Sequence, residues 1–298
     1  MEIHCIDESH GENYAAYCGD CIEIVSEMPS ESIGLSVYSP PFSHLFIYSS
    51  SERDMGNVRS DDEFFTQYGF LLKELYRVTK PGRLTAVHCS DMPRTKSMHG
   101  SVGIYDMPGD IIRAHEAQGW TYHSRVCIWK DPVVEMTRTK ALGLLYKQLQ
   151  KDSTRSRVGL PDYLLVFRKT PADEATADKV GQDSSMFPVS QWQQWASPVW
   201  MDINQTNVLN ARAARADKDE KHLCPLQLDL IERAILLWSN RGDTILSPFM
   251  GIGSEGHGAI KTGRRFIGCE LKESYYRQAV KNLQAAEAIS NSDMFMAK

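Results

Sequence analysis

The chain has 298 residues, of which 42% are hydrophobic and 24% charged, with 13 prolines and 20 glycines. This is ordinary globular usage; it excludes collagen-like and wholly disordered classes, and the length allows one elaborated domain or two small ones. The net charge of −5, taken alone, argues against a nucleic-acid partner, because phosphate binding normally requires a basic surface.

Short apolar runs bounded by Gly, Pro, Ser or Asp alternate with longer helical patterns along the chain. Two stretches repeat apolar residues at three and four: Phe64 to Tyr76, stopping at Lys80-Pro81-Gly82, and Leu226 to Trp238, ending near Arg241-Gly242. The alternation predicts an α/β fold with a largely parallel sheet. The expected strands are Ile33–Tyr38, Leu84–Cys89, Arg125–Trp129, Tyr163–Phe167, Thr244–Leu246 and Arg265–Cys269.

Membrane and metal sites are not expected. No apolar run approaches the roughly 18 residues of a membrane span, and the first ten residues lack a basic start followed by an apolar stretch. We therefore expect a cytoplasmic protein with reduced thiols. Cys18 and Cys21 form one CxxC, but no second pair of ligands follows at a spacing that suits zinc.

Two segments differ in charge from their surroundings. Residues 170–190 are acidic, contain two prolines and lack periodicity, which indicates a surface linker. Arg138–Lys169 holds eight basic and two acidic side chains, a local charge of +6 that leaves −11 for the rest of the chain. This segment is either a solvated basic face or a surface that contacts phosphates.

Ser39-Pro40-Pro41-Phe42 directly follows the expected strand Ile33–Tyr38. Two consecutive prolines cannot continue a central strand, so the chain turns at the carboxyl edge of the sheet, where ligands bind in open parallel sheets. The Ser39 hydroxyl and the Pro40 carbonyl can accept the hydrogens of a planar amino group, and Phe42 offers a face for stacking. An ordinary surface turn is the alternative.

A second motif, Asp243–Gly253, reads DTILSPFMGIG: a short strand, a glycine-rich turn and then a helix that begins near Ser254. The glycines let the backbone approach a ligand closely. The next strand ends in Glu270, the position where an acidic side chain holds a ribose diol. The order of strand, turn, helix, strand and acid indicates a nucleoside-type cofactor.

Together these motifs resemble a known enzyme family. Ser39-Pro40-Pro41-Phe42 resembles the (D/N/S)PP(Y/F/W) motif of S-adenosylmethionine-dependent amino-methyltransferases, and Ser247–Ser254 resembles their DPFxGSGT cofactor loop. The catalytic motif precedes the cofactor loop, and Tyr17-Cys18-Gly19-Asp20 stands near the start. This order is similar to that of beta-class DNA methyltransferases, which act on cytosine N4 or adenine N6. It implies a Rossmann-like sheet with a circularly permuted motif order.

The resemblance assigns roles position by position. Asp20 would hydrogen-bond the adenine amino group of S-adenosylmethionine, and Glu270 would hold its ribose hydroxyls. Pro225 lies in a segment, Lys221–Leu226, that would lead a helix past the methionine end of the cofactor. The cofactor loop contributes Ser247, Pro248, Phe249, Gly251 and Gly253.

The resemblance also implies the reaction and shows two departures from the pattern. Ser39 to Phe42 would hold a flipped base for direct methylation of its exocyclic amine, without a covalent enzyme intermediate. Ser247 stands where the loop usually has Asp, and Gly251-Ile252-Gly253-Ser254 replaces Gly-Ser-Gly-Thr. These departures leave the methionine ammonium without an assigned partner.

The expected layout places the catalytic domain in residues 1–130 and 222–298, with a target-recognition region inserted at 131–221. That region includes the strand near 163–167 and the linker 170–190, and it would contact double-stranded DNA. The candidate phosphate contacts are Arg138, Lys140, Lys147, Lys151, Arg155 and Arg157. The segment Ser43–Asn57 is expected to form a loop, either one that closes over the base or a plain surface loop.

Three functional hypotheses follow. The first is a DNA amino-methyltransferase, with cytosine N4 favoured over adenine N6 because Ser at the position of Ser39 is associated with N4 enzymes in this family. The second is an RNA or protein amide methyltransferase, although such relatives usually carry Asn at that position and place the cofactor loop first. The third is a non-catalytic DNA-binding module, which the Ser247 replacement would favour.

Overall fold

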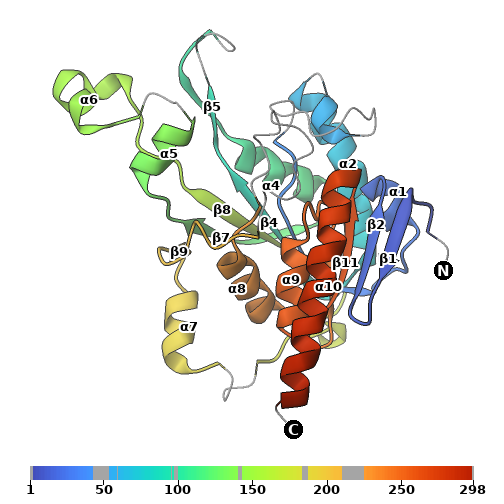
Figure 1. Cartoon of the computed structure of the whole chain (residues 1–298). Coiled ribbons are helices and arrows are strands. Elements are labelled where there is room, and N and C mark those ends of the chain that lie inside the picture. Colours follow the sequence, from blue (N-terminus) through green and yellow to red (C-terminus); the bar gives the residue numbers. More distant parts are fainter. Residues whose placement is uncertain are drawn as a thin grey trace.

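The computed structural model describes residues 3–42, 54–58, 60–94, 96, 100–139, 143–182, 187–209 and 225–296. A nine-stranded sheet runs through the molecule in the order β1-β2-β11-β10-β3-β4-β8-β7-β9, with helices on both faces (Figure 1). Its strands are β1 (Asp7–His10), β2 (Tyr14–Cys18), β3 (Ile33–Tyr38), β4 (Thr79–Ser90), β7 (Thr121–Ile128), β8 (Asp162–Arg168), β9 (Val199–Trp200), β10 (Thr244–Ser247) and β11 (Arg265–Glu270).

The sheet is largely parallel, as the sequence predicts. The central strands β2, β11, β10, β3 and β4 pair parallel, whereas β8 runs antiparallel to both of its neighbours and β1 runs antiparallel to β2. All six expected strands are present. The hairpin β1–β2 and the short β9 were not expected from the sequence, because Tyr14–Cys18 is short and rich in small residues and β9 has only two residues.

Helices cover the two faces of the sheet and bury two apolar layers. The helices α1 (Cys21–Ser26), α2 (Asp61–Val78) and α4 (Met107–Ala117) pack on one face. The other face is covered by α8 (Leu228–Trp238), α9 (Ser254–Lys261) and α10 (Glu273–Met296), which lie side by side in Figure 1. Among the described residues, no helix is long and apolar enough to cross a membrane.

The longest helix on the first face shows how local sequence sets its ends. Ser60 caps α2 by accepting the backbone N–H of Glu63 at 3.2 Å, and three acidic residues occupy the first turn, where they favourably meet the helix dipole. The helix ends at Val78, earlier than the Lys80-Pro81-Gly82 stop expected from the sequence, because Thr79 already enters β4.

The segment after β8 is attached to the amino-terminal edge of the sheet. Asp178 donates its backbone N–H to the Pro81 carbonyl at 2.9 Å and pairs with Lys80 at 2.9 Å. The buried guanidinium of Arg83 joins the same edge by donating to the Gly34 carbonyl at 2.8 Å and to the Asp243 carboxylate. The contacts of Asp178 therefore hold this part of the segment to the sheet.

The remaining elements belong neither to the nine-stranded sheet nor to the helices that cover it. Figure 1 shows α5 and α6 (green) away from the helices that cover the sheet. By contrast, β8 and β9, which also belong to residues 131–221, are members of the main sheet. These remaining elements are β5 (Met92–Arg94), β6 (Gly103–Tyr105), α5 (Pro132–Thr139), α6 (Tyr146–Lys151), α7 (Val189–Trp195) and the short 3-10 turns η2 (Met55–Asn57), η3 (Ser153–Arg155) and η4 (Glu174–Thr176).

Candidate active site

A cleft of about 1100 Å³, measured to its open mouth, lies at the carboxyl ends of β2, β11, β10 and β3. The chain leaves β10 toward β11 and leaves β3 toward β4, so the crevice between β10 and β3 is the switch point at which open α/β sheets bind ligands. Ten of the twelve expected catalytic and cofactor residues line it: Asp20, Ser39, Pro40, Pro41, Phe42, Pro225, Pro248, Phe249, Gly251 and Glu270.

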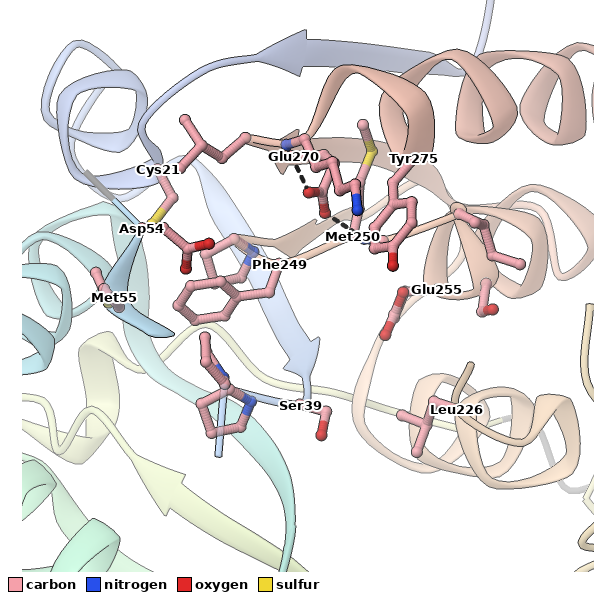
Figure 2. A pocket seen from close by; sticks show the side chains of 18 of the residues that line it. Cys21, Ser39, Asp54, Met55, Leu226, Phe249, Met250, Glu255, Glu270 and Tyr275 are labelled. Carbon is pink, nitrogen blue, oxygen red and sulfur yellow. Dashed lines mark hydrogen bonds between the residues drawn. The ribbon is translucent and has the colours of Figure 1, made fainter. Parts of the chain in front are cut away.

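Glu270 lines the cleft and is held there by two backbone hydrogen bonds (Figure 2). One carboxylate oxygen accepts the backbone N–H of Gly251 at 2.9 Å, and the other accepts that of Lys272 at 2.8 Å. Burial raises the pKa of Glu270 to about 7. Gly251 has φ of 51°, and a Cβ added there would contact no atom of the described residues within 4 Å, so these residues leave space beside the turn for a ligand.

Ser247 and Gly253, the other two expected cofactor residues, do not line the cleft. Ser247 is fully buried at the end of β10, and its hydroxyl has no hydrogen-bond partner in the part of the chain that the structure describes. Gly253 precedes α9 with φ of 85°, and an added Cβ would lie 3.3 Å from the Ala279 Cβ. Gly253 thus supplies a left-handed backbone conformation before α9, and Ser247 ends β10; both positions belong to the motif without lining the cleft.

Ser39 is connected to a buried polar network behind the cleft. Its hydroxyl lies 3.2 Å from both the Nδ1 atom and the carbonyl oxygen of His88 on β4. The Nε2 atom of His88 lies 3.1 Å from Asp162, whose other carboxylate oxygen accepts a hydrogen bond from Lys130. Burial alone would raise the pKa of Asp162, but the neighbouring His88 and Lys130 hold it at about 2.

Several cleft residues were not expected from the sequence. Asp54 caps the turn η2 and accepts the Gly56 N–H at 2.8 Å, and Met55 follows it in the wall. These two belong to the expected loop Ser43–Asn57, of which residues 43–53 lie outside the described part. Glu255 and Tyr275 lie on the opposite side of the cleft (Figure 2).

The sequence patterns around these residues are either common or involve positions far apart in the chain, so they did not indicate a site. An Asp before a Gly-containing turn and an acid in the first turn of a helix are both ordinary capping patterns, so Asp54 and Glu255 carried no special mark. His88 and Asp162 are far apart in sequence and meet because β4 and β8 pair antiparallel. No spacing rule connects such positions.

Electrostatically, the cleft is acidic. Among the described residues, four carboxyl side chains line it, with one lysine, Lys272, whose ammonium lies 4.5 Å from the centre of the Tyr275 ring. Its walls also carry a set of apolar and aromatic side chains. The arrangement therefore suits a flat ligand that carries hydroxyl groups and positive charge. The acidic residues are Asp20, Asp54, Glu255 and Glu270, and the apolar ones include Met55, Leu226, Phe249, Met250 and Ile252.

The residues expected to contact phosphates fall into three groups: exposed, already paired with an acid, and outside the described part of the chain. Lys147 and Lys151 are exposed one turn apart on α6. Arg157 instead donates to both oxygens of the buried Glu135 at 3.1 and 3.3 Å, so its charge is already compensated. Lys140 lies outside the described residues, as do the side chains of Arg138 and Arg155.

The basic residues that give the local charge of +6 do not all lie at the cleft end of the strands. Arg168 and Lys169 lie at the end of β8 opposite the cleft, because Arg168 pairs with Leu84 at the start of the buried part of β4. Arg168 forms a bidentate pair with Glu174 at 2.6 and 2.7 Å, and Lys169 donates to the Thr79 carbonyl at 2.7 Å. The sum over Arg138–Lys169 therefore overstates the charge near the cleft.

The CxxC cysteines are buried free thiols, and Cys21 also lines the cleft. Cys18 is buried in β2 and Cys21 begins α1, and burial raises the pKa of both thiols. Within the described ranges, no group of three His, Cys, Asp or Glu side chains is placed to hold a metal ion.

Comparison with known proteins agrees with this geometry. The family model described as "DNA methylase", N6_N4_Mtase, matches residues 33–281. The type II methyltransferase M1.MboII of Moraxella bovis is 47% identical over 279 residues, which cover 87% of this chain and 92% of the relative.

Two solved structures are similar in fold. The putative DNA modification methylase TTHA0409 of Thermus thermophilus, complexed with S-adenosylmethionine, matches with a TM-score of 0.64 at 20% identity and covers 92% of this chain and 96% of its own. The PvuII DNA methyltransferase, which is cytosine-N4-specific, matches with a TM-score of 0.63 at 17% identity over 94% of this chain and 92% of its own. The chain therefore belongs to the N6_N4 family of DNA methylases, and it is a DNA methyltransferase whose cofactor is S-adenosylmethionine.

Proposed function

We propose that this protein methylates the exocyclic amino group of a base flipped out of double-stranded DNA, with cytosine N4 favoured over adenine N6. The observation that carries the proposal is that Ser39 and Glu270 face one cleft from opposite sides, so that a base bound at the first would meet a cofactor bound at the second. Family membership covers both kinds of amino-methyltransferase and leaves the target base to be determined.

The residues present in the cleft fit S-adenosylmethionine. Glu270 retains free lone pairs on both oxygens for a ribose diol, and Asp20 stands at the end of β2 for the adenine amino group. Phe249 and the open space at Gly251 provide an apolar surface for the nucleoside. When bound, S-adenosylmethionine supplies a methyl group already activated by a sulfonium.

The protein's own groups prepare the acceptor amine. If His88 donates its Nε2 proton toward Asp162, its Nδ1 atom is left as an acceptor for the Ser39 hydroxyl. The lone pairs of Ser39 then face the cleft and accept one amine hydrogen, while the Pro40 carbonyl accepts the other. These hydrogen bonds favour a pyramidal, more nucleophilic nitrogen.

The side chains around Ser39 can take up the proton that methylation of the amine releases. Methylation forms one N–C bond, breaks one C–S bond and releases one proton from the nitrogen. Ser39 contacts that nitrogen and His88 can accept the proton through it, with Asp162 stabilising the resulting imidazolium. Phe42 and the apolar wall exclude water from the reacting atoms.

The preference for cytosine N4 rests on Ser39. A hydroxyl is a neutral hydrogen-bond acceptor, and Ser at this position is the form of the motif associated with N4 enzymes. Residues 131–221 are proposed to provide target recognition, with Lys147 and Lys151 on α6 as phosphate contacts. Contacts to phosphates would offset the few kcal/mol that base flipping costs.

The test is mass spectrometry of nucleosides from duplex DNA incubated with the protein and S-adenosylmethionine. We expect N4-methylcytosine, and we expect Ser39→Ala to reduce its formation at least about 100-fold while cofactor binding is retained. N6-methyladenine without N4-methylcytosine would overturn the base preference. A protein that binds the cofactor but methylates neither base would be a non-catalytic module of this fold.

A further inference from the structure

The cleft contains an acidic side chain for which the expected family roles have no use. Glu255 occupies the first turn of α9, is only 4% exposed, and directs its carboxylate into the cleft between Leu226 and Tyr275 (Figure 2). Among the residues that the structure describes, no basic side chain pairs with it, and the donor it receives is its own backbone N–H. Ionising a buried carboxyl without a nearby cation is costly, and a positively charged ligand group beside Glu255 would offset that cost.

Ser247 supplies no carboxylate to the cleft. The loop of this family usually carries Asp where this chain has Ser247, and here that side chain is fully buried and does not line the cleft. A cofactor with an α-ammonium group therefore meets no carboxylate from the usual position. Glu255, eight residues further along the chain, supplies one from the adjoining helix.

The geometry of the cleft separates Glu255 from the nucleoside end. Glu270 lies at the end of β11, and Asp20 follows β2, whereas Glu255 lies toward Leu226 and Ser39 (Figure 2). If the ribose bound at Glu270 and the methyl group faced Ser39, the side of the cleft near Leu226 and Glu255 would be left for the amino-acid portion. That portion carries the ammonium.

From these observations we infer that Glu255 binds the α-ammonium of the S-adenosylmethionine amino-acid moiety and takes the place of the loop acid that this chain lacks. Burial, with the neighbouring charge of Glu270, raises the pKa of the Glu255 carboxyl to about 8. A bound ammonium would favour its ionised form and satisfy the buried charge. The adjacent Ser254 hydroxyl, buried and without a hydrogen-bond partner among the described residues, provides a further polar group beside the same moiety.

The inference rests on S-adenosylmethionine as cofactor and is independent of which base is methylated. It is tested by calorimetric titration of the wild type and Glu255→Gln with three ligands. S-adenosylmethionine carries a sulfonium and an ammonium, S-adenosylhomocysteine keeps only the ammonium, and methylthioadenosine has neither. Glu273→Gln, an exposed glutamate outside the cleft lining, is the matched control.

We expect Glu255→Gln to weaken binding of both ammonium-bearing ligands by about 10- to 100-fold, the range for one charge-assisted hydrogen bond. Methylthioadenosine should bind the variant as it binds the wild type, which also shows that the variant is folded. A loss confined to S-adenosylmethionine would assign the carboxylate to the sulfonium and overturn the inference. Equal losses for all three ligands, or no loss, would overturn it as well.

The binding test of Glu255 can fail or succeed independently of the test of methylation. A protein that methylates no base but shows the expected ligand pattern would still have Glu255 as its ammonium partner. Conversely, a protein that methylates cytosine but binds both ammonium-bearing ligands equally well in wild type and Glu255→Gln would retain its function and refute this assignment.

Discussion

Replacing Glu255 by Gln should stabilise the free protein at high pH while weakening cofactor binding. The unfolded carboxyl ionises near its ordinary pKa of 4.5, whereas the folded one keeps its proton until about pH 8. The folded state therefore loses stability as pH rises from about 4.5 to about 8, and a neutral glutamine avoids that loss. At about 1.4 kcal/mol per pKa unit, the destabilisation above pH 8 reaches a few kcal/mol.

The assay is urea unfolding of the wild type and Glu255→Gln without cofactor at pH 5, 6.5 and 8.5. We expect nearly equal free energies of unfolding at pH 5 and an advantage for the variant that grows to a few kcal/mol at pH 8.5. Glu116→Gln, at an exposed position on α4, should give no such trend. A difference that is constant across the three pH values, or that favours the wild type at pH 8.5, would refute the reasoning.

Three further predictions concern the network behind Ser39, the DNA surface and a buried ion pair. His88→Ala should lower kcat about 10- to 100-fold with little change in the cofactor Kd, because it acts by orienting the Ser39 proton. Replacing Lys147 and Lys151 together by Ala should weaken DNA binding and reduce the slope of log K against log salt by about 2. Arg157→Ala should cost about 3 kcal/mol of stability, measured by urea unfolding, because it removes both guanidinium hydrogen bonds from the buried carboxylate of Glu135.

Each of these has its own control. For His88, the Asn variant retains an acceptor and should recover part of kcat; a cofactor Kd that rises as much as kcat falls would point to a structural defect instead. Lys73 and Lys281, exposed on α2 and α10, replaced together by Ala remove the same charge and should leave the salt slope unchanged. For Arg157, unaltered stability with a reduced salt slope would make it a phosphate contact after all.

Most of the sheet was predictable because it is encoded locally. Ile33–Tyr38 is buried at every position, and such continuous apolar runs are typical of parallel strands covered on both faces. The hairpin β1–β2 was missed because its inner strand, Tyr14–Cys18, relies on parallel pairing with β11 from the other end of the chain. No pattern within five residues reports a partner that is so distant in sequence.

The site was predictable where a motif dictates backbone shape, and less so where a side chain acts alone. Proline and glycine turns fixed Ser39 and Gly251 at the carboxyl edge, and the strand end fixed Glu270. Ser247 is buried and does not line the cleft, whereas Glu255 faces it from the first turn of α9. Such orientation depends on packing, which the order of residues does not reveal.

The central claim is that one cleft holds the cofactor with its reactive end toward Ser39. A crystal structure of the protein with S-adenosylhomocysteine tests it most directly. We predict the ribose hydroxyls on Glu270, the α-ammonium on Glu255 and the sulfur atom facing Ser39. A nucleoside bound elsewhere, or a sulfur atom directed away from Ser39, would contradict the account.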